Sequence, residues 1–90
     1  MLIALIARDK PDALQTRMDN RPAHVDYLKS SGASVFQAGP LLIDGAMAGS
    51  LVILDLPDMA AANDWAANDP YAKAGLFASV ELIEWNKVLG

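Results

Sequence analysis

Apolar residues occur along this chain in two arrangements, as short continuous runs and as residues repeated at helical spacing. A short apolar run bounded by charged or turn-forming residues is typical of a strand, whereas apolar residues three, four and seven positions apart indicate one face of a helix. The segments that predict strands are residues 2–7, 33–38, 50–56 and 77–88. The segments that predict helices are residues 11–30 and 57–68. The predicted order is therefore strand, helix, strand, strand, helix, strand.

The first predicted helix has an apolar face that is interrupted by a proline. The apolar residues at helical spacing are Leu14, Met18, Val25 and Leu28. Pro22 lies between them, and proline lacks an amide donor and collides with the preceding helical turn. We therefore expect the helix to kink or to restart at Pro22, with the apolar residues on one face.

Two short signals mark the end of the second strand and the connection after it. Gly39 and Pro40 should end the strand, because proline cannot donate to a central ladder. Asp44 and Gly45 form a turn signal within residues 41–49, a stretch with no strong pattern of its own. We therefore expect residues 41–49 to form a loop.

This order of elements predicts an α+β fold, a ferredoxin-like βαββαβ unit with a four-stranded antiparallel sheet and both helices on one face. A chain of 90 residues forms a single domain, residues 1–90, because it has too little interior for two cores. The other sheet face needs cover, since 53% of the residues are apolar. We expect at least a homodimer, a dimeric α+β barrel in which two sheets pack face to face. The alternative is a monomer with a wet sheet face, although the first and third strands look apolar on both faces.

The remaining composition narrows the partners. Without cysteine the chain can form neither a disulfide nor a thiolate metal site, and one histidine among scattered carboxylates is poor material for any metal site. A net charge of −4 argues against attraction to nucleic-acid backbones. The first residues indicate a strand and not a signal peptide, and no apolar run approaches the roughly 20 residues of a membrane helix. We therefore expect a cytoplasmic location, with no nucleic-acid or membrane partner.

The only histidine, His24, is the first candidate for chemistry. It follows Pro22 and Ala23, where the helix is expected to restart. Unpaired amides at a helix start carry partial positive charge, which disfavours imidazolium and would leave a neutral ring able to accept a proton. His24 is thus a candidate general base. The alternative is a histidine that caps or packs at the margin of a helix.

Two arginines share the helix with this histidine. Arg17, Arg21 and His24 are four and three positions apart, so in a continuous helix they form one ladder beside the apolar face. Arg21 falls almost within that face, where a guanidinium is costly unless a carboxylate or a bound anion pairs with it. Both arginines are therefore candidates for binding an anionic substrate, and the alternative is an internal salt bridge or an interface contact.

Asp69 and Ser50 are further polar candidates. The residue before a proline is extended, so the Asp69 carboxylate should point off the end of the second helix, where it can meet His24. A carboxylate bonded to one ring nitrogen makes the other nitrogen a better base, and the alternative is a helix-ending Asp-Pro turn. Ser50 can donate a hydrogen bond to a ligand oxygen or cap a turn. The sequence contains no nucleophile elbow, phosphate loop or dinucleotide motif.

Together, several short segments resemble the YciI-like protein family along nearly the whole chain. The most specific combination is Arg-Pro-Ala-His at 21–24 with Asp-Pro-Tyr at 69–71. The other matching segments are Ala-Arg-Asp at 7–9, Ala-Gly-Pro at 38–40, Gly-Ser at 49–50, and the stretch from Trp65 to Gly75. The resemblance implies a dimeric ferredoxin-like α+β barrel whose pocket holds a catalytic pair, His24 and Asp69.

The same resemblance implies the other residues of the pocket. The substrate-binding positions that it suggests are Arg17, Arg21, Ser50 and Tyr71. It implies no cofactor and no metal. Residues 41–49 are short beside the longer connection of many relatives, which puts the pocket rim and the substrate in question.

Two functions of different classes remain open. In the first, His24 oriented by Asp69 removes a proton from a small anionic or aromatic substrate, as in the lyase-type dehydrohalogenation of a chlorinated hydroxyquinol to which members of the resembling family are linked. In the second, a binding or accessory module recognises the anion without transforming it. Cofactor-free monooxygenases share the barrel, but that is an analogy of fold alone. The pH dependence of turnover separates the first two, because only a base titrates in a rate.

Overall fold

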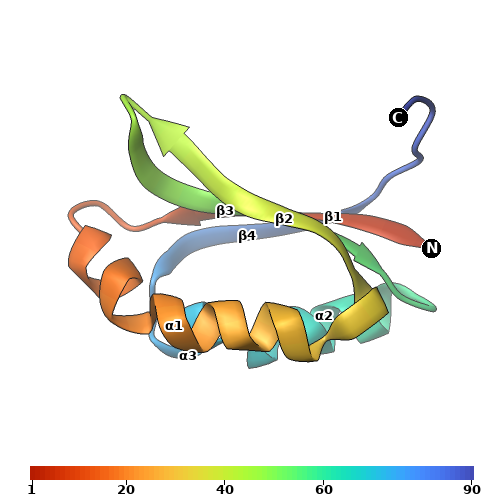
Figure 1. Ribbon diagram of the computed structural model, residues 1–90, viewed down its shortest axis with the longest axis horizontal. Coiled ribbons are helices and arrows are strands. Elements are labelled where there is room, and N and C mark those ends of the chain that lie inside the picture. The colour runs from red at the N-terminus through yellow and green to blue at the C-terminus, as the bar shows by residue number, and fades with distance from the viewer.

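The structure, a computed structural model that describes residues 1–90, confirms the predicted order of elements. Figure 1 shows the sheet as one layer and the helices as a second layer on one of its faces. The elements are β1 (Leu2–Asp9), α1 (Leu14–Ser30), the 3-10 turn η1 (Gly32–Ser34), β2 (Val35–Ile43), β3 (Ala46–Asp55), α2 (Met59–Asn68), α3 (Pro70–Lys73) and β4 (Phe77–Glu84). The fold is the expected ferredoxin-like βαββαβ unit of the α+β class.

The sheet has the strand order β2-β3-β1-β4, and each neighbouring pair is antiparallel. The central strands β1 and β3 alternate apolar side chains between the two faces of the sheet, because successive side chains of a strand point to opposite sides. The face toward the helices forms the core. The core residues are Ile3, Leu5, Ala7, Val52, Leu54, Ala62 and Trp65.

The face of the sheet away from the helices is also apolar at its centre. Ala4 of β1 pairs with Ile53 of β3 on one side and with Ile83 of β4 on the other, so the three residues form a row across the sheet. Ala4 and Ile53 are each 7% exposed, whereas Ile83 is 50% exposed and Leu51, on the same face of β3, is 39% exposed. No helix covers this surface (Figure 1). We call the row and Leu51 the open face.

Pro22 bends α1 and does not end it. The helix continues through Pro22 from Leu14 to Ser30, so a restart at Pro22 is wrong. Figure 1 shows the first turns of α1 running in a different direction from the rest, as expected for a proline that removes one helical hydrogen bond. His24 therefore lies in the helix interior, and the electrostatic argument from a helix start does not apply to it.

The apolar face predicted for α1 is only partly buried. Leu14 and Met18 are each 47% exposed, whereas Leu28 packs against the core. The buried residues of α1 are instead Arg17 and His24. Arg17 and His24 therefore face the interior, and an apolar residue packs against the core only near the end of the helix, at Leu28.

A long hairpin of β2 and β3 occupies the place of the predicted loop. β2 continues through Pro40, so the prediction that Gly39 and Pro40 end the strand is wrong. β2 lies at the edge of the sheet, where proline is tolerated because a missing donor on the outer side breaks no ladder bond. Only Asp44 and Gly45 separate the strands, and both have positive φ, 50° and 79°, as a type I′ hairpin turn requires. The predicted turn at Asp44 and Gly45 is confirmed, but the prediction of a loop over residues 41–49 is wrong.

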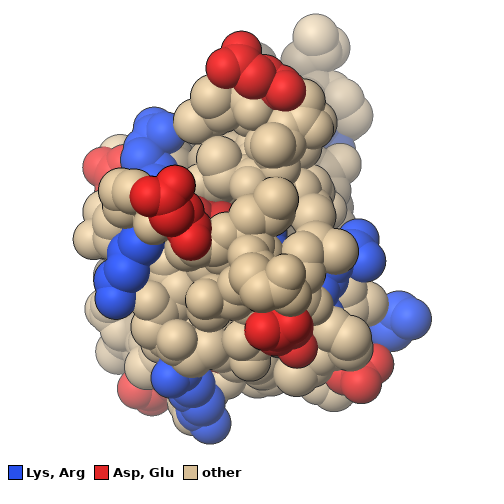
Figure 2. Space-filling view, turned by 90° about the vertical axis from the view of Figure 1, so that its left-hand side faces the viewer, with Lys and Arg blue, Asp and Glu red and all other residues tan.

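Smaller differences concern the ends of the other elements. β4 ends at Glu84, short of the predicted limit at Val88, and the chain beyond it rises on the side of the open face (Figure 1). The short helix α3 directly follows α2 and was not predicted. On the side of the molecule shown in Figure 2, acidic and basic side chains are interspersed among uncharged atoms. None of the helices has the length and apolar character needed to cross a bilayer.

Candidate active site

A cavity of about 190 Å³ lies between α1 and the sheet, and Tyr71 of α3 is part of its wall. One part of its wall is apolar and the other carries the polar residues of the ladder and their neighbours. The main apolar lining residues are Val25, Leu28, Pro40, Met47 and Val52. The polar lining residues are Arg17, Arg21, His24, Ser50 and Tyr71.

His24 and Asp69 form a buried hydrogen-bonded pair at this cavity. Nδ1 of His24 lies 2.8 Å from Oδ1 of Asp69, although the two residues are far apart in the sequence. The same Oδ1 accepts a hydrogen bond of 2.9 Å from the backbone N–H of Tyr71, which makes Asp69 the N-cap of α3. Asp69 has φ −61° and ψ 127°, the extended backbone expected before proline. The carboxylate is thus fixed by its own helix before it meets the imidazole.

The pairing defines which ring nitrogen of His24 is free. A carboxylate accepts, so Nδ1 of His24 carries the proton and donates it to Asp69. Nε2 makes no hydrogen bond within the chain, and no buried polar atom lacks a partner, so Nε2 is not sealed from the cavity. The ring therefore presents a lone pair to whatever the cavity holds.

Tyr71 packs between the imidazole of His24 and the guanidinium of Arg17. Its ring stacks on the imidazole of His24 with a centroid distance of 3.9 Å, and the guanidinium carbon of Arg17 lies 4.5 Å from the Tyr71 centroid. Burial raises the pKa of Tyr71 above its usual value, and the opposing effect of the positive charges of Arg17 and Arg21 is smaller. The phenol is therefore protonated at neutral pH and is available as a hydrogen-bond donor.

The charge of Arg17 is balanced by a buried carboxylate, Asp9. Its Nε lies 2.7 Å from Oδ2 of Asp9 and its Nη2 lies 2.9 Å from Oδ1, a bidentate pair in which both side chains are buried. Nη2 also donates to Oγ of Ser50 at 2.9 Å. Burial alone would lower the pKa of Arg17, but the hydrogen bond and the charge of Asp9 outweigh it, so the pKa is raised. Arg17 therefore stays charged and is paired.

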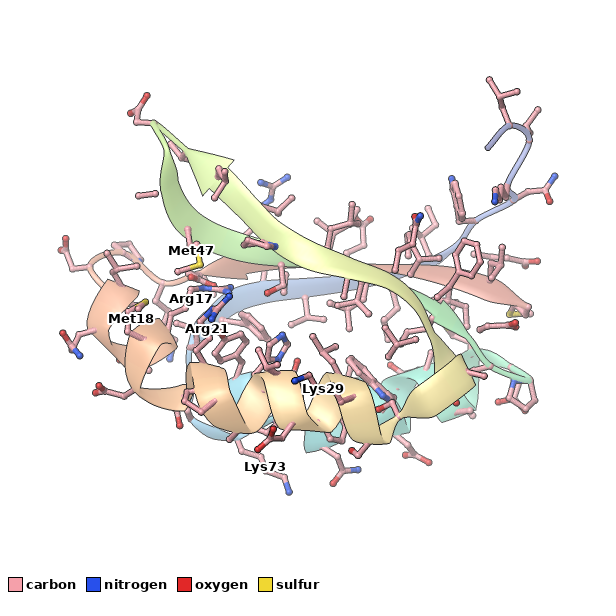
Figure 3. All side chains as sticks on the ribbon, in the orientation of Figure 1. Arg17, Met18, Arg21, Lys29, Met47 and Lys73 are labelled. Atoms are coloured by element: carbon pink, nitrogen blue, oxygen red, sulfur yellow. The ribbon has the colours of Figure 1, made fainter.

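Arg21 lacks such a partner. No carboxylate lies within 4.0 Å of its guanidinium, although it lines the same cavity. Figure 3 shows Arg17 and Arg21 reaching from α1 toward the sheet, with their heads close to Met47 of β3. The site therefore has one paired and one unpaired guanidinium, and the unpaired one is suited to an anionic ligand.

The structure places all the predicted site residues together. Arg17, Arg21, His24, Ser50 and Tyr71 line the cavity, and Asp69 lies behind His24. For the two arginines the sequence left open an internal salt bridge or a contact with an anionic substrate. Arg17 is in an internal salt bridge, and Arg21 is not.

Asp9, the partner of Arg17, was missed by sequence reasoning. Its signal was its position as the charged end of the first apolar run, on the face of β1 that carries Ala7. The chain has no cluster of three or more His, Cys, Asp or Glu side chains placed to hold a metal ion. The chemistry that these residues offer is proton acceptance at one nitrogen beside several hydrogen-bond donors.

Comparison with known proteins gives relatives over the whole length of the chain. Protein YciI of Escherichia coli O6:H1 is 34% identical over 97 aligned positions, which cover 98% of this chain and 99% of that protein. An uncharacterised protein of Haemophilus influenzae is 36% identical with the same coverage. The alignments are longer than the 90 residues of this chain, so these relatives have residues that it lacks.

Solved structures give a similar result. The 5-chloro-2-hydroxyhydroquinone dehydrochlorinase of Burkholderia phenoliruptrix AC1100, in complex with 2,5-dihydroxybenzoquinone, is 35% identical with a TM-score of 0.91 over 96% of this chain and 94% of that chain. An antibiotic biosynthesis monooxygenase, 14% identical with a TM-score of 0.61 over 99% of this chain and 100% of that chain, shares the fold. The model of the YCII-related domain matches residues 1–86. The chain therefore belongs to the YCII-related domain family.

Proposed function

We propose that the protein is a small cofactor-independent enzyme of lyase type, in which His24 is the general base and Asp69 orients it. The observation that carries this proposal is the buried hydrogen bond of 2.8 Å between Nδ1 of His24 and Asp69 on the wall of a cavity. The carboxylate fixes the tautomer that leaves Nε2 unprotonated, and it stabilises the imidazolium that forms when Nε2 takes a proton.

The cavity and its charges suggest the class of substrate. A cavity of about 150 Å³ accepts benzene. The cavity of this protein, with about 190 Å³, therefore accommodates one substituted ring. The unpaired Arg21 favours an anion, and the apolar wall favours a flat hydrocarbon framework. The Burkholderia relative was solved with 2,5-dihydroxybenzoquinone, a single ring whose hydroxyls are vinylogous acids. We therefore propose a monocyclic hydroxylated substrate that binds as its anion.

The proposed reaction is an elimination of hydrogen halide from such a ring. The reacting form is the keto tautomer, in which a hydroxyl proton has moved to the halogen-bearing carbon. Nε2 of His24 then removes the proton of a second ring hydroxyl, and the electron pair of that O–H bond forms a carbonyl. The adjacent ring double bond shifts toward the halogen-bearing carbon, and halide departs with the electrons of the carbon–halogen bond. Negative charge develops on a ring oxygen as the proton leaves. Ser50, Tyr71 and Arg21 supply donors for that charge, and the proton on His24 then passes to water.

The test is the release of chloride from 5-chloro-2-hydroxyhydroquinone, kept free of oxygen, by the purified protein. A positioned base contributes about a hundred to ten thousand-fold, so His24→Ala should lower kcat by about that factor. Asp69→Asn should also lower kcat, because an amide does not stabilise imidazolium as a carboxylate does. Asp64→Asn, at an exposed carboxylate of α2, should turn over at the parent rate.

The outcomes separate the two functions left open by the sequence. Turnover by His24→Ala at the parent rate would contradict the proposed base. Tight binding of 2,5-dihydroxybenzoquinone by the parent protein, with no chloride release at any pH, would favour a binding module in which His24 only contributes a hydrogen bond.

A further inference from the structure

We infer that Asp9 is a positioning residue, which holds Arg17 so that Arg17 in turn fixes the hydroxyl of Ser50 as a donor to a ligand oxygen. The inference rests on the proposed function, because it concerns how the same cavity recognises its ligand. Its basis is the chain of short contacts from Asp9 through Arg17 to Ser50.

Asp9 is placed by the strand that carries it. Side chains alternate along β1, so Asp9 lies on the same face as Ala7, which is the face toward the helices. The register of β1 against β4 shifts between Arg8 and Asp9 because β4 carries one extra residue there, Ala78, so β1 itself keeps its alternation and Asp9 still pairs with Phe77. The carboxylate is therefore held by the rigid sheet.

Arg17 cannot move freely toward a ligand. Its Nε hydrogen and both hydrogens of Nη2 are used by the carboxylate of Asp9 and by Oγ of Ser50. Arg17 is 2% exposed. If its guanidinium moved away from Asp9, both the guanidinium and the carboxylate would be buried charges without a partner. Arg17 thus acts on Ser50 at a fixed distance.

The hydroxyl of Ser50 is left with one role. A hydroxyl has one proton to donate and can accept twice, and the guanidinium of Arg17 occupies an acceptor position. Ser50 donates to no group within the chain, and it lines the cavity. Its proton is therefore directed at the ligand, and the positive charge behind it strengthens the donation.

A fixed donor determines what can bind opposite to it. An oxygen without a proton, such as a phenolate or quinone oxygen, accepts from Ser50. A ligand amino group at the same position would place its N–H donors opposite the hydroxyl donor of Ser50. The hydroxyl would then lack an acceptor, which is costly in a buried site. The chain from Asp9 to Ser50 thus selects for an oxyanion at this end of the ring.

The test is a double-mutant cycle on the binding of 2,5-dihydroxybenzoquinone. Binding is measured by titration calorimetry at constant salt. Ser50→Ala should weaken binding by roughly ten to a hundredfold, the range for a hydrogen bond to a charged group. Asp9→Asn should weaken binding several-fold when Ser50 is present and less than about twofold in the Ser50→Ala background, because the two act through one contact. Asp55→Asn, at an exposed carboxylate of β3, is the matched control and should leave affinity unchanged.

Asp9→Asn leaves Arg17 without its partner, so its thermal unfolding is recorded alongside. If this variant does not fold, the paired variant Asp9→Asn with Arg17→Gln removes both buried charges together and should bind as weakly as Ser50→Ala. Effects of Asp9→Asn that are equal in the two backgrounds would overturn the role of Asp9 and leave the proposed enzyme intact. Absence of quinone binding by the parent protein would overturn both proposals.

Discussion

At the scale of single residues, Arg17 and Arg21 lie one turn apart on α1 and have opposite surroundings. Arg17 is buried and bound to Asp9 and Ser50, whereas Arg21 lines the cavity with no carboxylate near it. A paired guanidinium contributes to the shape of a site, and an unpaired one contributes charge. The two residues should therefore respond differently to substitution.

Arg21→Gln should weaken the binding of 2,5-dihydroxybenzoquinone by roughly tenfold or more, because it removes a charged donor from the cavity. The free energy of unfolding should change by less than about 0.5 kcal/mol, since Arg21 is in no ion pair. Titration calorimetry and urea unfolding measure the two effects. Lys29→Gln, an exposed position on the same helix, controls for net charge, and an equal loss in that variant would refute a specific role for Arg21.

Tyr71 and Tyr27 should make the protein sensitive to high pH. Burial raises the pKa of both phenols, and the charge of Asp69 adds to the effect at Tyr27. The unfolded chain loses these protons at its ordinary pKa of about 10, before the folded protein does. The contribution of the two tyrosines to the free energy of unfolding should therefore be fully present below that pH and be lost as pH rises above it. Urea unfolding at several pH values measures this fall.

Substitution of either tyrosine checks the assignment. Tyr71→Phe keeps the aromatic ring against His24 and removes the titrating group, so the fall in stability above pH of about 10 should be less steep. Tyr27→Phe should do the same while losing the hydrogen bond of 2.8 Å to the Trp65 carbonyl. A fall of unchanged steepness in both variants would assign the alkaline sensitivity to other groups.

Single residues also show what the sequence could indicate about the site. The extended backbone of Asp69 followed from Pro70, and its encounter with His24 was expected on that ground and from the family resemblance. The pair of Asp9 with Arg17 was not expected, because nothing local in either segment specifies a contact between a strand end and a helix face. Long-range pairs of this kind depend on how elements pack.

At the scale of elements, the hairpin of β2 and β3 lies against β1 at Gly49 with no room for a side chain. A methyl group on Gly49 would overlap with the carbonyl oxygen of Ala7, whereas one on Gly39 would meet no neighbour. Gly49→Ala should therefore lower the free energy of unfolding by about 1–3 kcal/mol, and it should also disturb the adjacent Ser50. Gly39→Ala is the matched control, with a change of less than about 1 kcal/mol. Urea unfolding compares them, and equal effects would contradict a close approach at Gly49.

The elements differ in how far their sequences determined them. The apolar runs of β1 and β3 and the helical spacing in α2 predicted the order βαββαβ, because each pattern is local. The length of β2 was not predictable, since Pro40 is tolerated only because β2 is an edge strand, and strand order is a property of the whole sheet. The inward face of α1 was misjudged because a bent helix turns Arg17 and His24 toward the cavity, in place of Leu14 and Met18.

At the scale of the whole molecule, the open face of the sheet leaves apolar side chains exposed in a single subunit, Leu51 at 39% and Ile83 at 50%. They flank Ala4 and Ile53 at the centre of this face, which are each only 7% exposed. Apolar side chains in such a row are compatible with a second identical row across a twofold axis. We propose a homodimer in which the two open faces pack together.

Leu51→Glu should convert this dimer to a monomer, because it would place two like charges in an apolar interface. The variant should remain folded, since Leu51 is already 39% exposed in one subunit. Sedimentation velocity at micromolar concentration measures the assembly, and circular dichroism the fold. Leu42→Glu, at an equally apolar but 60% exposed position of the hairpin, should leave the assembly unchanged. A parent protein that sediments as a monomer would refute the proposal.

The two-residue turn at Asp44 and Gly45 has a consequence for how relatives of this protein can diverge. The buried pair of His24 and Asp69 belongs to α1 and the start of α3, whereas Pro40 and Met47, on the opposite wall of the cavity, belong to the arms that this turn joins. Insertions at the tip would lengthen those arms without shifting His24 or Asp69. A lineage could therefore acquire new ligands by remodelling one wall while inheriting its reaction chemistry unaltered on the other.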